Sequence, residues 1–113
     1  MKNDFLDYVE DIIESIDSTM KFTEDMEYDE FMRDDKTTSA VIRKLEVIGE
    51  ASKKIPEKVK SDYSQIPWKD MAGMRDKLIH EYFGIDLKRV WKTVKKDIPE
   101  LKPLFEKILK LNK

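Results

Sequence analysis

The chain has 113 residues, enough for one ordinary domain with a single core but too few for separate catalytic and regulatory domains. Charged residues make up 41% and hydrophobic residues 40%, with three glycines and four prolines, so the composition favours amphipathic helices over a sheet protein. The lack of cysteine excludes a disulfide framework and thiolate ligands or nucleophiles, and it gives no reason to expect an oxidising compartment. We therefore treat residues 1–113 as a single domain located in the cytoplasm.

The formal net charge of -2 conceals an uneven distribution of charge along the chain. Residues 1–35 hold 13 Asp/Glu and 3 Lys/Arg, a net charge of -10, and residues 36–113 hold 11 and 19, a net charge of +8. Both parts could simply form solvated helix faces. In the functional interpretation, the basic part attracts a polyanion while the acidic part faces away from it or toward a basic partner.

Helical periodicity of the apolar residues predicts the elements of the first half. A first helix covers about residues 4–21, and Thr23 opens a second, shorter one that runs to a charged break. A long helix with the clearest apolar stripe in the chain follows over about residues 37–54. Pro56 ends this long helix, because proline disfavours helical geometry in the residue before it.

The second half begins with a connector, residues 56–70, in which two prolines leave room for at most one helical turn. A fourth helix is predicted over residues 71–83, with Gly84 as its C-cap. Asp86 starts a fifth helix, which Pro99 interrupts or kinks before a final apolar run. The expected fold is all-α, an antiparallel up-and-down bundle of four to five main helices, and no apolar stretch is long enough to span a membrane.

The helix predicted over residues 71–83 carries an arginine inside its apolar stripe. With Met71 at zero and about 100° per residue, Arg75 lies at about 40°. A cation in such a stripe must meet a carboxylate, reach solvent at a groove, or bind an anionic ligand. Glu46 or Glu50 on the long helix could supply the carboxylate, and such a pair would then merely fix helix packing.

His80 is the only histidine, and it lies at about 180° on the same wheel, one turn after Asp76. A carboxylate at this spacing can orient the imidazole and favour its protonated form, although an ordinary exposed histidine at a helix end is the alternative. With one His, no Cys and no metal-binding carboxylate motif, we expect neither metal nor cofactor. The remaining chemistry is acid–base catalysis by His80 assisted by Arg75, the minimal set for cutting RNA through its own 2′-hydroxyl.

Residues 75–82, RDKLIHEY, resemble the R-x4-H-x-Y signature of HEPN domains, specifically the HepT-like toxin family. Three further blocks resemble that family in the same order, at residues 46–51, 66–68 and 86–91, so the likeness covers about residues 36–102. One departure is Asp76, where many relatives carry Asn.

The resemblance implies a homodimeric helical bundle with a metal-independent endoribonuclease site that gathers Arg75 and His80 from both subunits. It also implies a toxin–antitoxin pair, in which a minimal nucleotidyltransferase (MNT) antitoxin binds the toxin and can transfer AMP to the motif tyrosine, Tyr82. Tyr82 could instead be a core tyrosine with its hydroxyl bonded.

The helical wheel gives a separate argument for a site shared between two subunits. Arg75 and His80 lie about 140° apart on a straight helix, so they converge poorly within one chain. A two-fold axis that relates two such helices can bring Arg75 of one chain near His80 of the other. The dimer then has two histidines, which allows one to act as base and the other as acid.

Basic residues are expected near the rim of the shared site, where they would bind RNA: Lys77, Lys88, Arg89 and Lys92.

The alternative function is a non-catalytic helical partner, or AMP-accepting substrate, of a nucleotidyltransferase. A purely structural helical bundle is the third possible function.

Overall fold

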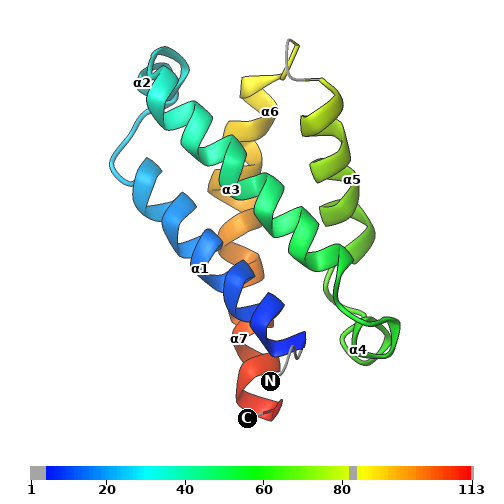
Figure 1. Cartoon of the computed structure of the whole chain (residues 1–113). Helices are drawn as coiled ribbons and strands as arrows, with labels where there is room; N and C mark the ends of the chain where they lie inside the picture. The colour runs from blue at the N-terminus through cyan, green and yellow to red at the C-terminus, as the bar shows by residue number, and fades with distance from the viewer. Residues whose placement is uncertain (1–4, 82–83, 113) are drawn as a thin grey trace.

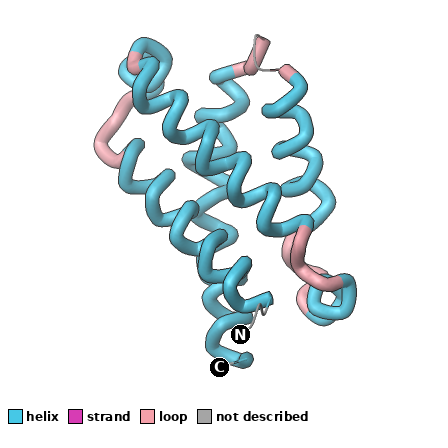
Figure 2. Tube along the Cα trace, in the orientation of Figure 1, coloured by secondary structure: helices cyan, strands magenta, loops and turns pink. Residues whose placement is uncertain are grey.

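The computed structural model describes residues 5–81 and 84–112, which form helices joined by short turns, with no strand among them (Figure 1, Figure 2). The elements in chain order are α1 (Phe5–Thr23), α2 (Tyr28–Arg33), α3 (Asp35–Lys53), α4 (Glu57–Asp62), α5 (Trp68–His80), α6 (Leu87–Lys92), the π-helical segment η1 (Thr93–Asp97) and α7 (Ile98–Asn112). The all-α prediction is therefore confirmed. In the part of the chain that is described, no helix is long and apolar enough to cross a membrane.

The helices α1, α3 and α5 and the stretch from α6 through α7 alternate in direction, as Figure 1 shows. The centre of the bundle is the packing of α1 against α3 and α7, while α5 packs mainly on α3. Apolar residues three or four positions apart form the fully buried stripes, such as Val41, Leu45 and Ile48 on α3. Because α5 is held chiefly by α3, its remaining faces are available for other contacts.

The start of the second helix differs from the prediction. Thr23 does not open a helix but ends α1, and its hydroxyl donates to the Thr19 carbonyl at 3.0 Å. Asp25 then adopts a left-handed conformation with φ 62°, which stops helical geometry. The next helix begins only at Tyr28, after Glu27 has formed a capping box.

The segment between α3 and α5 is more helical than predicted. The six residues of α4 exceed a single turn, and α5 begins at Trp68 rather than at residue 71. Trp68 is fixed by tertiary contacts, because its indole nitrogen donates to the Tyr63 carbonyl at 3.1 Å and its ring meets Phe105 edge-on at 5.5 Å.

The end of α5 differs from expectation, whereas the predicted interruption near Pro99 is present. Glu81, not Gly84, is the C-cap of α5, and no described glycine has a positive φ. The helical path continues from α6 into α7, but its α-helical form is interrupted just before Pro99. Proline cannot donate to the carbonyl four residues earlier and its ring crowds that turn, and here the preceding residues Thr93–Asp97 adopt the wider π-helical form.

Candidate functional site

The two helices that build the site, α3 and α5, approach most closely at Gly49. A Cβ atom added at Gly49 would overlap the Cβ of Arg75 and would lie 2.9 Å from the Met71 carbonyl oxygen. Only glycine fits this crossing without a shift of one helix. Gly49 therefore sets where the backbone of Arg75 stands, and this role was not predicted, although a single glycine inside a long amphipathic helix was the available signal.

Arg75 uses this position to reach carboxylates on both helices. Its Nε lies 3.1 Å from Glu50 Oε1, and its Nη1 lies 3.0 Å from Asp76 Oδ1. Of the two candidate carboxylates on α3, Glu50 makes the pair, while Glu46 lies 3.7 Å from Arg43. The Arg75 side chain is 27% exposed and that of Glu50 45%, so the pair lies at the surface rather than in the core. The guanidinium is thus oriented but still accessible to an anion.

A second cation, Lys53, completes this cluster. Its Nζ lies 3.1 Å from the same Asp76 Oδ1 that Arg75 contacts, so one carboxylate oxygen holds two positive groups side by side. Hydrogen bonds from Lys53 and then Arg75 keep the pKa of the Asp76 carboxyl below its ordinary value. Asp76 therefore stays ionised near neutral pH and holds both cations in place.

Lys53 was missed by sequence analysis, because only the folded contact between α3 and α5 brings it to Asp76. The signal available in the sequence was its spacing, one helical turn after Gly49 on the same face of α3.

His80 is the last residue of α5, and its side chain is exposed. The expected contact with Asp76 is not formed, and Asp76 Oδ1 instead accepts hydrogen bonds from Lys53 and Arg75. The His80 side chain makes no hydrogen bond or ion pair with any other residue in the described ranges. The imidazole is consequently free to meet a substrate or a second copy of the chain. Tyr82, the expected modification point, lies outside the described residues.

The exposed side of α5 that bears these groups also carries an apolar residue. Ile79 is 40% exposed and lies between Arg75 and Asp76 on the helical wheel, at about 80°. Arg75, Asp76, Ile79 and His80 define what we term the Arg75 face of α5. Ile79 is the apolar residue on this otherwise charged face.

A family model described as ribonuclease HepT-like matches residues 12–108. The chain belongs to the HepT-like ribonuclease family. It is 54% identical over 110 residues to "Probable ribonuclease HepT" of Thermococcus cleftensis, an alignment that covers 97% of this chain and 100% of the relative. It is 52% identical over 109 residues to "Putative RNase MJ1216" of Methanocaldococcus jannaschii, covering 96% of this chain and 90% of the relative. No solved structure gives a significant match.

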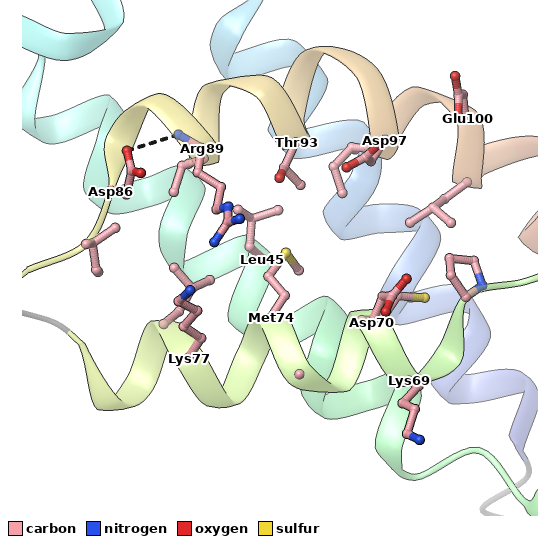
Figure 3. Close-up of a pocket in the computed structure, with 18 of the residues that line it drawn as sticks. Leu45, Lys69, Asp70, Met74, Lys77, Asp86, Arg89, Thr93, Asp97 and Glu100 are labelled. Carbon is pink, nitrogen blue, oxygen red and sulfur yellow. Dashed lines mark hydrogen bonds between the residues drawn. The ribbon is translucent and has the colours of Figure 1, made fainter.

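The four basic residues expected at one rim separate into two groups in this HepT-like chain. Lys77 and Arg89 line a groove of about 800 Å³ between α5 and the α6–α7 stretch (Figure 3). Lys88 and Lys92 are exposed but do not belong to the lining of that groove. Arg75 and His80 do not line it either, so the groove and the Arg75 face lie on different sides of α5.

Proposed function

We propose that this chain is a metal-independent endoribonuclease, the toxin of a toxin–antitoxin pair, with a site completed by homodimerisation. The observation that carries the proposal is the Arg75 face of α5. In this member of a ribonuclease family, an accessible Arg75 is held by Glu50 and Asp76. The same helix ends in an exposed His80 whose side chain has no partner among the described residues.

The arrangement of this face supports a composite site. Consider two α5 helices that cross antiparallel about a two-fold axis passing midway between Lys77 and Leu78. Arg75 then lies opposite His80 of the second copy, and Asp76 lies opposite Ile79 of the second copy. The same contact covers the exposed Ile79 side chain. A single crossing thus brings together two Arg75 and two His80 side chains.

The proposed reaction is an attack of the RNA 2′-oxygen on the adjacent phosphorus. One His80 imidazole takes the 2′-hydroxyl proton as the P–O2′ bond forms, and the protonated His80 of the second copy gives a proton to the 5′-oxygen as the P–O5′ bond breaks. Arg75 offsets the negative charge that grows on the phosphate oxygens, with Lys53 as a second cation beside it. The products are a 2′,3′-cyclic phosphate and a 5′-hydroxyl, and no cofactor takes part.

RNA phosphates farther from the reacting bond are assigned to the exposed Lys88 and Lys92. Lys77 and Arg89 point into the groove on the other side of α5, away from this site.

Metal-independent cleavage and its dependence on the dimer can be tested together. Wild-type protein and an Ile79→Asp variant are incubated with structured and single-stranded RNA in EDTA, and cleavage is compared. The wild type is expected to be a dimer and to leave 2′,3′-cyclic phosphate ends. Ile79→Asp places an unpaired charge in the contact, and it should give a monomer that does not cut, as measured by analytical ultracentrifugation and by analysis of product ends.

A matched control is Leu111→Asp, which makes the same change at a side chain that is 62% exposed near the end of α7. The control should remain dimeric and active. Cleavage by monomeric Ile79→Asp would exclude a composite site. Absence of cleavage by the wild type would instead favour a non-catalytic partner of a nucleotidyltransferase.

The proposed partner is a cognate MNT antitoxin that transfers AMP to Tyr82. The Tyr82 oxygen would attack the α-phosphorus of ATP, an O–P bond would form, and pyrophosphate would leave as the phenolic proton is lost. Tyr82→Phe is expected to abolish labelling by the antitoxin and α-labelled ATP while helix content is unchanged. Tyr63→Phe, which alters a tyrosine bonded to Asn112 at 3.0 Å, should still be labelled. Labelling of the Tyr82→Phe variant would place the acceptor at another residue.

A further inference from the structure

The groove between α5 and the α6–α7 stretch is an opening toward the core. Its floor is apolar and includes Leu45 of α3, Met74 and Leu78 of α5, and Leu104 of α7. It extends along α5 from Pro67 to Glu81, so its length is that of a helix of about 13 residues, roughly 20 Å. A long apolar groove between two helices is the kind of surface that receives the apolar face of a third.

Charged side chains divide the groove into two ends. Lys77 and Arg89 face each other from opposite walls at one end, whereas Asp70 and Asp97 lie on opposite walls at the other end (Figure 3). None of these four side chains forms an ion pair within the described part of the chain. Glu100 and Lys69 also line the carboxylate end, and the Lys69 amine points away from the groove (Figure 3). The groove therefore has an apolar floor, two cations without ion pairs at one end and an excess of carboxylates at the other.

Two further carboxylates line the cationic end and weaken its positive charge, although the N-terminus of α6 partly offsets one of them. Asp86 accepts hydrogen bonds from the backbone N–H groups of Lys88 and Arg89 at 3.1 and 3.3 Å, so its side chain caps the N-terminus of α6. Glu81 remains as a single opposing charge at this end.

We propose that this groove binds an amphipathic helix of a protein partner, with acidic residues in its first turn and basic residues in its last. That charge order is the one helices ordinarily prefer, because it complements the helix dipole. The acidic first turn meets Lys77 and Arg89 and the basic last turn meets Asp70 and Asp97, so the partner helix runs antiparallel to α5. It contacts the side of α5 opposite the Arg75 face, and the binding does not depend on ribonuclease activity.

The test uses three synthetic 15-residue amphipathic peptides with the same apolar stripe. One has an acidic first turn and a basic last turn, one is basic at both ends, and one is acidic at both ends. Wild-type protein is expected to bind the mixed-charge peptide most tightly, as measured by fluorescence anisotropy at low ionic strength. Methyl NMR signals of Leu45, Met74 and Leu104 should shift on binding, because these residues form the floor.

The double variant Lys77→Glu/Arg89→Glu makes both ends acidic. It should lose on the order of fivefold to tenfold in affinity for the mixed-charge peptide and should prefer the peptide that is basic at both ends. The control Lys88→Glu/Lys92→Glu carries the same charge change outside the groove and should leave the preference unchanged. All four substituted side chains are exposed, so both variants are expected to fold, and circular dichroism checks this.

Three results would overturn the proposal: no binding of any peptide, equal binding of all three by the wild type, or an unchanged preference in Lys77→Glu/Arg89→Glu. Dissociation of a dimer by that variant alone would also overturn it, since the groove would then be occupied by a second copy of the chain.

Discussion

Replacement of His80 by alanine is expected to abolish RNA cleavage while the fold and the dimer remain. Proton transfer by a positioned side chain contributes about 10²–10⁴-fold to a rate, and the proposed site has no other histidine to replace it. His80 is exposed at the end of α5 and has no described partner, so its removal should cost little stability. Single-turnover cleavage in EDTA, together with circular dichroism and ultracentrifugation, measures the two effects separately.

The matched control is Glu81→Ala, at the neighbouring exposed residue, whose backbone rather than side chain caps α5. This variant should cleave RNA at the wild-type rate. If His80→Ala cleaves as fast as the control, another group moves the proton and the catalytic assignment is wrong.

The two helices that the sequence predicts most closely, α1 and α3, are those with a local signal. On α3, Val41, Leu45 and Ile48 are buried at the spacing visible in the sequence, because a helix that packs along its whole length repeats its contacts every three to four residues. The start of α5 has no such signal. Trp68 is held there by Tyr63 and Phe105, contacts that exist only once the bundle has formed.

The candidate site also has features that the sequence could predict and features that depend on contacts between helices. That Arg75 needs a carboxylate follows from its place in an apolar stripe, and Glu50 supplies it. The sequence could not indicate that Asp76 bonds Lys53 instead of His80, since a helical wheel describes one helix and Lys53 belongs to another. The groove was likewise unpredictable, because it results from α5 packing mainly on α3 and standing apart from α7.

Substitution of Gly49 by alanine should damage both stability and catalysis. The added Cβ would overlap Arg75 Cβ and crowd the Met71 carbonyl, which is backbone and cannot rotate away, so α3 and α5 must separate. Overpacking of this kind costs about 1–3 kcal/mol. Arg75 would move with α5, and a misplacement of about 1 Å can reduce a rate by about 10²-fold. Thermal unfolding and single-turnover cleavage measure the two losses.

Gly73→Ala provides the reference for this change. Gly73 lies inside α5, and a Cβ there would meet nothing within 4 Å, so alanine should only gain helix propensity, up to about 1 kcal/mol. Gly49→Ala gains the same propensity in α3, and the difference between the two variants therefore isolates the cost of the helix crossing. Equal stabilisation by both substitutions would mean that α3 and α5 can move apart freely, and Gly49 would then have no part in placing Arg75.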